Sequence, residues 1–431
     1  MNHDVIVLGA GIAGLTAARQ LAIAGLRVHV VEARNRVGGR IFSHNVGQEV
    51  VELGAEFVHG KPPILWNLME EAGLQTCEFD GKRFCWDNDL LQECCDDFGQ
   101  DFKWLEALKD WHGEDCSFAE YLAIMRVPQA SRKRLIGFVE GFNAADHRVI
   151  GVAALAKQQA IEDATEGDRL FRVRGGYAQV PEFLARQIEH LGGTVSMETR
   201  AIAIRWKQGN VGVECLHKGE VLAYRAGAVV IALPLGVLQS GALTISPSPK
   251  QAMNLLSQIR VGHACRTVLL FRRMFWTDSA ARHGVHGLDA LSFLHAPSEL
   301  FPVWWTKFPE ESSTLVAWAG GPRADAIAGR AREELEDEAL GELAKMFTVE
   351  DARLRDLLVR TDSHNWQTDP LALGSYSYLP TGALHVPDAL SEVIKSTLFF
   401  AGEHTDTTGN WGTVHGAMES GLRAAHQVLH R

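Results

Sequence analysis

A glycine-rich turn near the N-terminus is the first candidate for binding chemistry. Gly9, Gly11 and Gly14 have the GxGxxG spacing, directly after an apolar run at 5–8. In a strand–turn–helix unit, the first glycine permits the tight turn, the second lets a pyrophosphate approach the backbone, and the third lets helix and strand pack closely. The N–H groups at the helix N-terminus then face the phosphates. The pattern predicts a dinucleotide site that includes Ala13 of the same turn.

An acidic residue and a second glycine pair extend this site. Glu32 closes the second apolar run, about 20 residues after the glycines, where a carboxylate accepts hydrogen bonds from ribose hydroxyls. The stretch 34–40 adds Arg34, Gly39 and Arg40, whose guanidinium and backbone N–H groups make a further anion site. A dinucleotide that spans both sites is extended, and FAD fits this better than NAD.

The elements that position these residues alternate between strand and helix. After the strand at 5–8, the pattern predicts a helix at 12–24 and a strand at 27–31. A strand at 398–401 and a helix at 414–429 close the chain. Between them we expect a helix at 180–191, strands near 195 and at 201–206, 211–215 and 228–232, and a charged helix at 331–347. This order predicts an α/β fold whose nucleotide-binding sheet is completed by distant parts of the chain.

The remaining stretches are less regular. Residues 62–165 favour helices, whereas 261–320 alternate strands and turns. For most of four tryptophans in strand-like contexts we expect core packing: Trp276, Trp304, Trp305 and Trp318. Lys307 matches no catalytic motif and is expected to be a charge in solvent or at a pocket rim.

Composition limits the class of protein. The chain has 431 residues, of which 46% are hydrophobic and 22% charged, which is typical of a globular protein of two or three domains. Its net charge of −11 argues against a nucleic-acid partner and is compatible with a cationic small molecule. No run of about 18 apolar residues predicts a membrane span, and no signal peptide is visible at the N-terminus, so a cytoplasmic protein without a membrane partner is expected.

The cysteines predict no special chemistry. Their number, seven, is odd, and they form no regular framework, which argues against a disulfide scaffold. No CxxC pair is present, so we expect no metal site. Cys94 and Cys95 are interpreted as two thiols.

Five further segments carry recognisable motifs. They are GAEFVHG at 54–60, RGGY with the following VP at 174–181, ALPLGVL at 232–238, the segment from Trp366 to GSYSY at 374–378, and FAGEHT with TVHGA at 400–417. Together with the glycine turn, they resemble the flavin-containing amine oxidases. This family includes monoamine oxidases, polyamine oxidases and flavin-dependent histone lysine demethylases, and the motifs are most similar to those of polyamine oxidases.

The resemblance implies a two-part architecture. A Rossmann-like FAD-binding domain is interleaved with an α+β substrate-binding domain. The first would take residues 1–61, 170–248 and 392–431, and the second 62–169 and 249–391. Residues 62–165 resemble the family least.

The resemblance also assigns residues to the cofactor. The loop at the flavin ring would be Gly54, Ala55, Glu56 and Phe57, the adenine would meet the backbone of Ala201, and Trp366, Gly402 and Glu403 would complete the contacts. The last helix would open at Thr413 and Val414, with its N–H groups toward the pyrimidine edge of the ring. Monoamine oxidases tether the flavin through a cysteine where this chain has Ser375, so the FAD is expected to be non-covalent.

For catalysis, the resemblance implies amine oxidation. The C–H next to nitrogen passes as hydride to flavin N5, and the imine is hydrolysed afterwards. Tyr376 would form an aromatic wall against the amine. Where monoamine oxidases place a second tyrosine, this chain has Thr413, so only half of the cage is present, as in polyamine oxidases and demethylases. His59 falls where animal polyamine oxidases also carry histidine, and is a candidate for the substrate pocket.

One position departs from the family. Most members carry a lysine in a strand that runs Lys-x-x-x-x-Phe and closes with Phe-Trp; through a water it assists the reaction with O2. Here Arg266 precedes Phe271 at that spacing, so it occupies the lysine's place. An arginine holds a water but cannot act as a base at usable pH. This predicts slow use of O2 with another electron acceptor preferred, or an unusual substrate geometry; the alternative is a structural ion pair.

Other functions stay open at this point. An L-amino-acid oxidase needs a cation for the substrate carboxylate, and such enzymes usually place arginine where this chain has Glu56 and Phe57. An amine dehydrogenase or biosynthetic tailoring flavoenzyme with poor O2 reactivity is a further alternative. A flavin-bound interaction protein is a third class. The substrate would be a polyamine or a monoamine, and the oligomeric state is not predicted.

Overall fold

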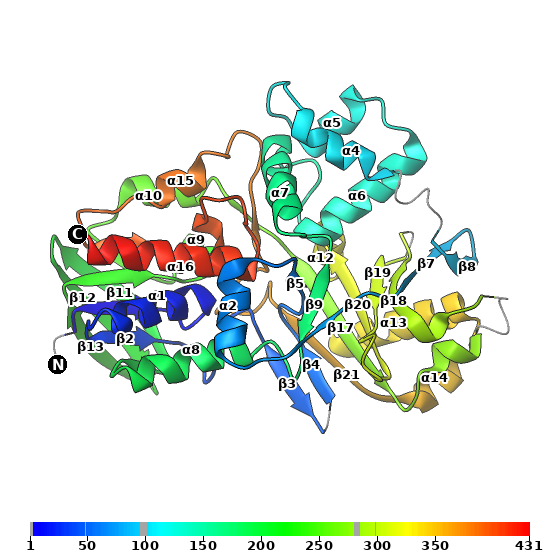
Figure 1. Ribbon diagram of the computed structural model, residues 1–431, viewed down its shortest axis with the longest axis horizontal. Helices are drawn as coiled ribbons and strands as arrows, with labels where there is room; N and C mark the ends of the chain where they lie inside the picture. The colour runs from blue at the N-terminus through cyan, green and yellow to red at the C-terminus, as the bar shows by residue number, and fades with distance from the viewer. Residues whose placement is uncertain (1–2, 48, 95–100, 280–284, 298) are drawn as a thin grey trace.

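The computed structural model describes residues 3–47, 49–94, 101–279, 285–297 and 299–431. Within these ranges, the chain folds into two β-sheet halves joined by a third, helical layer (Figure 1). Both termini lie in the same half, at its outer edge (Figure 1).

A parallel sheet of five strands forms the centre of the half that carries the termini. Its order is β10-β2-β1-β14-β23. In that order the strands are Thr194–Ser196, Val28–Val31, Val5–Leu8, Ala228–Ile231 and Leu398–Phe400. Val5 is paired with Val28 on one side and with Ala228 on the other. Because the strands come from three separated parts of the chain, the expectation of a sheet completed by distant segments is confirmed.

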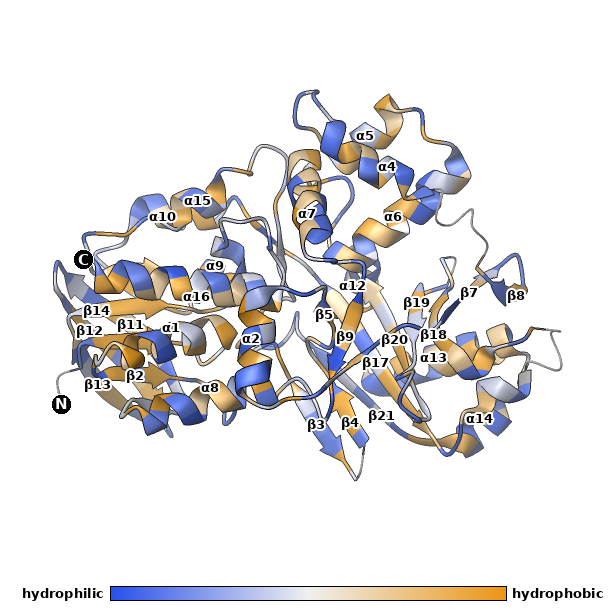
Figure 2. Cartoon of the chain, in the orientation of Figure 1, coloured by the Kyte–Doolittle hydropathy of each residue, from blue (hydrophilic) through white to orange (hydrophobic). Residues whose placement is uncertain are grey.

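The two faces of this sheet are covered differently. Val5 and Val7 of β1 pack into a core with three helices: α1 (Ile12–Ile23), α8 (Gln179–His190) and α16 (Val414–Leu429). Ile6 and Leu8, which point to the opposite face, belong to a separate core. Figure 2 shows β14 as apolar along its length, as a strand covered on both faces should be.

A mixed sheet, antiparallel except that β15 runs parallel to β11, covers that second face. Its order is β13-β12-β11-β15. These strands are Glu220–Ala226, Asn210–His217, Thr199–Lys207 and Thr244–Ser246. Three short helices pack into the same core: α9 (Leu235–Gln239), α10 (Lys250–Leu256) and α15 (Val386–Leu390).

A sheet of seven strands organises the other half. Its order is β21-β17-β20-β19-β18-β7-β8. The strands are Leu358–Asn365, Ala264–Phe271, Thr314–Gly320, Val303–Trp305, Leu291–His295, Lys82–Asp87 and Leu90–Glu93. Its core is closed by α12 (Pro322–Ile327), α13 (Arg332–Phe347) and α14 (Asp351–Leu357).

A layer of helices lies over the junction of the halves (Figure 1). It consists of α4 (Lys103–Glu106), α5 (Phe118–Ile124), α6 (Gln129–Asn143) and α7 (Val152–Ala164). Helix α2 (Pro63–Glu71) and the hairpin of β3 (Ser43–Val46) and β4 (Glu49–Glu52) lie near the junction. A small sheet there consists of β5 (Val58–His59), β9 (Leu170–Val173) and β6 (Thr76–Glu78). A further pair consists of β16 (Arg260–Val261) and β22 (Ser377–Tyr378).

Most expected elements are present with ends shifted by a few residues, but some strands were not predicted. Residues 62–165 are mainly helical as expected, yet they also contain β7 and β8, which add an edge to the seven-stranded sheet. The sequence reading also omitted β13, which continues the meander after β12. Both errors have one cause: these strands alternate exposed and buried residues, and pairing rather than composition stabilises them.

The interpretation of Cys94 as a free thiol is also wrong. Cys85 and Cys94 form a disulfide across the β7–β8 hairpin, with Cα atoms 5.1 Å apart. Cys95 lies outside the described residues. None of the described helices is long and apolar enough to cross a membrane.

Candidate active site

One continuous cavity of about 990 Å³ runs between the two halves and under the helical layer. It begins at the turn between β1 and α1 and reaches α4, α6 and α7. We call the part lined by Gly9, Gly11 and Glu32 the nucleotide end, and the part lined by α4, α6 and α7 the outer end.

Nearly all residues that the sequence singled out line this cavity. These are Gly9, Gly11, Ala13, Glu32, Arg34, Gly39, Arg40, Gly54, Ala55, Glu56, Phe57, His59, Ala201, Arg266, Trp366, Tyr376, Gly402, Glu403, Thr413 and Val414. Gly14 does not line it, and its role is in packing: an added Cβ would clash with the carbonyl oxygen of Gly9. The tertiary structure therefore brings motifs from both ends of the chain into one place.

The glycine turn has the shape that a dinucleotide needs. Gly9 adopts a φ of +96°, which favours glycine. An added Cβ at Gly11 would meet nothing within 4 Å, so the backbone there borders open space. Gly11 is the N-cap of α1 and has no side chain to cap it, which leaves the first N–H groups of the helix available to a ligand. These residues fit the pyrophosphate of FAD.

Glu32 is held rigidly at the nucleotide end. Its two carboxylate oxygens accept hydrogen bonds from the backbone N–H groups of Ala10 and Arg34, each at 2.8 Å. Burial raises the pKa of Glu32 above its usual value. Each oxygen keeps a lone pair for a ribose hydroxyl. Close by, the predicted contact Ala201 lies at an irregularity in the pairing of β11 with β12.

Arg34 and Trp366 form one wall of the same part of the cavity. Arg34 pairs with Asp369 at 2.9 Å and lies 5.8 Å from the centre of the Trp366 ring. The indole N–H of Trp366 donates to the carbonyl of Leu53 at 2.9 Å. Both side chains are thus fixed by the protein before any ligand binds.

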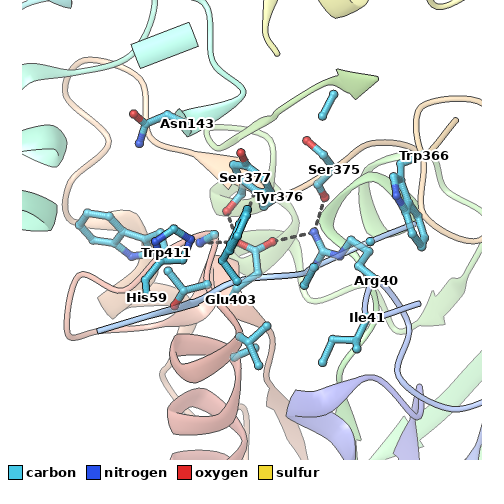
Figure 3. A pocket seen from close by; sticks show the side chains of 18 of the residues that line it. Arg40, Ile41, His59, Asn143, Trp366, Ser375, Tyr376, Ser377, Glu403 and Trp411 are labelled. Carbon is cyan, nitrogen blue, oxygen red and sulfur yellow. Dashed lines mark hydrogen bonds and ion pairs between the residues drawn. The ribbon is translucent and has the colours of Figure 1, made fainter. Parts of the chain in front are cut away.

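A buried carboxylate ties three segments together in the middle of the cavity. Glu403 pairs with Arg40 at 3.0 Å and accepts hydrogen bonds from the Ser377 hydroxyl at 2.6 Å and the Gly412 N–H at 3.0 Å (Figure 3). Burial opposes its ionisation, but the charge of Arg40 and the surrounding hydrogen-bond donors together hold the pKa of Glu403 below its usual value. The sequence predicted this carboxylate as a cofactor contact. The structure adds that its oxygens already accept hydrogen bonds from donors of the protein.

Helix α16 opens directly onto the cavity. Thr413 is its N-cap, and its hydroxyl accepts a hydrogen bond from Gly416 N–H at 3.0 Å. The same hydroxyl donates to the Asn410 carbonyl at 2.7 Å. At Gly421 the helix packs so closely on α1 that a Cβ would clash with the carbonyl oxygen of Ala13. The positive end of the helix dipole therefore faces the cavity.

Tyr376, His59 and Phe142 meet near the centre of the cavity. The Tyr376 hydroxyl donates to the Phe142 carbonyl at 2.6 Å, and burial raises its pKa. The rings of His59 and Phe142 are 5.4 Å apart and perpendicular. Burial lowers the pKa of His59 to about 4, so the ring is neutral near pH 7. In Figure 3, Asn143, Trp411 and His59 lie on one side of Tyr376, and Arg40 and Trp366 on the other.

Arg266 forms an ion pair, in agreement with the alternative reading of this position. It pairs with Glu56 and donates to the Gly54 carbonyl at 2.6 Å. Arg172 pairs with the same carboxylate at 2.7 Å. Burial alone would raise the pKa of Glu56, but the neighbouring groups, chiefly the two guanidinium charges, together hold the pKa below its usual value. Trp305 completes the cluster by donating to Glu56 at 3.0 Å.

One expectation for this region needs correction. Lys307 is not in solvent: its side chain is buried and pairs with Glu49 at 2.8 Å. Most of the tryptophans are in the core as expected, since Trp276, Trp304 and Trp305 are buried. Trp305 also lines the cavity, as does Trp318. The sequence does not show whether a side chain faces solvent or the interior here, because that depends on which segments pack against it.

Several lining residues were missed by the sequence reading. Asn143, Gln158, Glu162 and Trp411 all contribute to the outer end or its approach. The signal that could have found two of them is the four-residue spacing of Gln158 and Glu162 on a helix, which places them on one face.

A group of possible cation ligands lies at the end of α6, although no metal site was predicted. Glu140, Asp146 and His147 place ligand atoms within 4.8 Å of one another. Their contacts are already made within the protein, because His147 is 2.6 Å from Glu140 and Asp146 pairs with Arg148 at 2.8 Å.

Comparison with known proteins agrees with this geometry. The family model described as flavin containing amine oxidoreductase matches residues 12–429. Polyamine oxidase 2 from Arabidopsis thaliana is 29% identical over 468 residues, which cover all of this chain and 89% of that protein. Flavin-containing amine oxidase B from Homo sapiens is 26% identical over 471 residues, covering 99% and 86%.

Other relatives are longer than this chain. Lysine-specific histone demethylase 1 homolog 2 from Arabidopsis thaliana is 27% identical over 453 residues, and the match covers 99% of this chain but 58% of that protein. For homolog 3 from the same plant, the chain spans 30% of the relative.

Solved structures show the same fold. A putrescine oxidase with bound putrescine superposes with a TM-score of 0.83 at 21% identity, and both chains are covered completely. Cyclohexylamine oxidase from Brevibacterium oxydans gives 0.81 at 22% identity, also over both complete chains. The fold is thus a Rossmann-like FAD-binding domain interleaved with an α+β substrate-binding domain. The chain belongs to the flavin-containing amine oxidoreductase family, whose members are FAD-dependent enzymes.

Proposed function

We propose that this protein oxidises an amine with FAD as its cofactor. The observation that carries the proposal is the single cavity, which joins a glycine turn suited to a pyrophosphate to an aromatic and neutral pocket at Tyr376 and His59. When bound, FAD supplies the acceptor for the hydride from the carbon next to nitrogen. The chain's own residues then have to bind, orient and desolvate the amine.

The residues at the centre have clear roles in this proposal. Tyr376 presents its ring as a wall to the amine, and its hydroxyl is fixed by the Phe142 carbonyl. His59, neutral near pH 7, offers one N–H donor and one acceptor nitrogen without adding a charge to repel an ammonium. Thr413 leaves the opposite side of the cage open and instead caps α16.

The residues at the nucleotide end would hold the cofactor. Gly9, Gly11 and the start of α1 would bind the pyrophosphate, and Glu32 a ribose. The N-terminus of α16 at Val414 would face the pyrimidine edge. Arg40 and Glu403 would keep the intervening wall rigid. Ser375 lacks the thiol needed for a thioether, so the FAD would be held without a covalent bond.

Arg266 has a positioning role in this proposal. Because its guanidinium is bound by Glu56 and the Gly54 carbonyl, it fixes the loop at 54–57. It cannot act as a base. Oxygen or another acceptor would reoxidise the enzyme, and we expect dyes or quinones to be better acceptors than O2.

The domain boundaries belong to the same proposal. The FAD-binding domain would comprise 1–61, 170–248 and 392–431, which contain every strand of the parallel sheet. The substrate-binding domain would comprise 62–169 and 249–391, which contain every strand of the seven-stranded sheet.

An L-amino-acid oxidase is the second candidate, and the cluster at Glu56 argues against it. Arg266 and Arg172 share this carboxylate, so the two buried arginines there are already neutralised in part. An incoming carboxylate would have to compete with Glu56 for them.

Anaerobic reduction of the flavin by a panel of compounds tests the proposed function. The panel contains monoamines, polyamines and L-amino acids, and the readout is loss of the flavin absorbance. We expect one of the amines without a carboxylate to bleach the flavin with the highest kcat/KM. Faster reduction by L-amino acids would overturn the choice between the two candidates. Bound flavin that no amine reduces would favour a flavin-bound interaction protein.

A further inference from the structure

The inner face of α7 carries polar side chains along the outer end of the cavity. Gln158 and Glu162 are four residues apart, so they lie on the same face of the helix, about 6 Å from each other. Gln158 accepts a hydrogen bond from the Asn143 amide at 3.1 Å and donates to the Trp411 carbonyl at 3.4 Å. These bonds orient the face toward the cavity, which both Gln158 and Glu162 line.

This face is continuous with the amine pocket. The Lys61 N–H donates to the carbonyl of Thr165 at 2.7 Å, so the end of α7 rests on the loop that follows His59. Phe142 touches both Tyr376 and His59, and Asn143 follows it directly on α6. Gln158 therefore lies against Asn143 and Trp411 near Tyr376, and Glu162 lies one helical turn away from Gln158 on the same face and in the same cavity.

Glu162 differs from the carboxylate beside it. In the described part of the chain, no hydrogen bond or ion pair reaches its side chain, and burial raises its pKa to about 7 with no cation opposing the shift. Asp163 is exposed and pairs with Lys109, while Gln159 donates to it at 3.2 Å. A half-buried carboxylate without a partner inside a cavity is costly unless a ligand supplies the positive charge.

The surroundings of Glu162 suit a flexible cation. Phe102, Phe138 and Phe142 line the outer end, with the rings of Phe138 and Phe142 stacked at 5.3 Å. Glu106 and Asp168 add two exposed carboxylates at the same end. Two arginines also line the cavity: Arg134, which pairs with Asp101, and Arg83 of β7.

We propose that Glu162 binds the distal ammonium group of an extended diamine or polyamine whose reacting nitrogen lies at Tyr376. The proposal rests on the proposed function and specifies its substrate class. The phenylalanine rings would contact the methylene chain, and Glu162 would form a desolvated ion pair at its far end. A monoamine of the same length fills the same space but leaves Glu162 unpaired.

Matched substrate pairs test this assignment. The holoenzyme is assayed with α,ω-diamines of increasing length and with n-alkylamines of the same carbon number, by anaerobic flavin reduction. For the best length we expect the diamine to exceed its monoamine in kcat/KM by about tenfold, as for one buried ion pair. Glu162→Gln should abolish that ratio by raising the apparent Kd for the diamine. The limiting rate of flavin reduction by the diamine, and both values for the monoamine, should stay unchanged. Asp163→Asn, the matched control, should keep the ratio.

A conservative variant separates binding from a structural role. Glu162→Asp keeps the charge but withdraws the carboxylate by about one methylene, so the preferred diamine should become longer by one carbon. A merely structural carboxylate would not move the preferred length. Should Glu162→Gln lose its flavin, this shift in Glu162→Asp decides the question.

The outcomes distinguish the two proposals. Equal kcat/KM for diamines and monoamines in the wild type, or a diamine preference that survives Glu162→Gln, overturns the role of Glu162 and leaves amine oxidation intact. Failure of every amine, diamines included, to reduce bound flavin overturns the proposed function and the role of Glu162 with it.

Discussion

The two ends of the cavity are built in different ways. At the nucleotide end, the binding groups are mostly backbone N–H groups whose positions follow from glycines at fixed spacing and from helix termini. At the outer end, the groups available for binding are side chains of α6 and α7, such as Asn143 and Glu162. Packing of the helices over the junction brings these side chains together.

This difference separates cofactor binding from substrate choice. A backbone cradle tolerates few changes, because a Cβ at Gly14 clashes with the chain itself. A helix face tolerates many, since side chains such as Gln158 and Glu162 can be exchanged without refolding the helix. Specificity can therefore change at the outer end while the nucleotide end stays constant.

The largest expected effect concerns the cofactor as a whole. With Ser375 in place of a cysteine, acid or heat precipitation should release all of the yellow colour into the supernatant. The measurement is the flavin absorbance of supernatant and pellet. Flavin retained in the washed protein pellet would show a covalent link and contradict the prediction.

Next in size is the loss of the carboxylate that joins the two halves. Glu56→Gln leaves Arg172 and Arg266 buried without their partner, and should lower the free energy of unfolding by about 3–5 kcal/mol. Urea denaturation of the apoprotein measures this. The double variant Glu56→Gln, Arg266→Met removes one stranded charge and should recover part of the loss. A single variant as stable as the wild type would show that the cluster is not a buried ion network.

At the centre of the cavity, Tyr376→Ala should separate substrate from cofactor. We expect kcat/KM for the best amine to fall about 100-fold because the wall that orients the amine is removed. The affinity for FAD should change little, since Tyr376 contributes to the pocket and not to the glycine cradle. Flavin fluorescence titration and steady-state kinetics give the two numbers, and a larger loss in FAD affinity than in turnover is the contrary result.

Two glycines of one turn provide a matched pair. Gly14→Ala should destabilise the apoprotein by about 1–3 kcal/mol, because the methyl group overpacks against the Gly9 carbonyl. Gly11→Ala should leave the apoprotein within about 0.5 kcal/mol of the wild type, since its Cβ enters open space. It should nevertheless weaken FAD binding. If Gly14→Ala and Gly11→Ala changed FAD affinity and stability equally, the assignment of Gly14 to packing and of Gly11 to binding would be wrong.

The smallest expected effect is on reoxidation. Arg266→Lys should react with O2 faster than the wild type by about two- to tenfold, because a lysine can hold and exchange a proton with a water where a guanidinium cannot. Stopped-flow mixing of reduced enzyme with O2 measures both rates. Fast reoxidation of the wild type, with the lysine variant no faster, would show that this position does not limit the use of O2.

The sequence by itself determined the nucleotide end. Gly9, Gly11, Gly14 and Glu32 act through spacing within one strand–turn–helix unit, and such local geometry is encoded locally. The strands at 5–8 and 228–232 were also clear, because strands covered on both faces are continuous apolar runs. The motifs near Tyr376 and Thr413 then identified the family and, with it, the flavin.

Only the tertiary structure decided the partners of the side chains. That Arg266 shares Glu56 with Arg172, that Lys307 is buried against Glu49, and that Cys85 bonds Cys94 all depend on which strands pair. The same holds for Glu162, whose significance lies in having no partner within reach among the residues that the structure describes. Spacing along a chain fixes local backbone geometry, but burial and pairing are set by contacts between segments that are far apart in sequence.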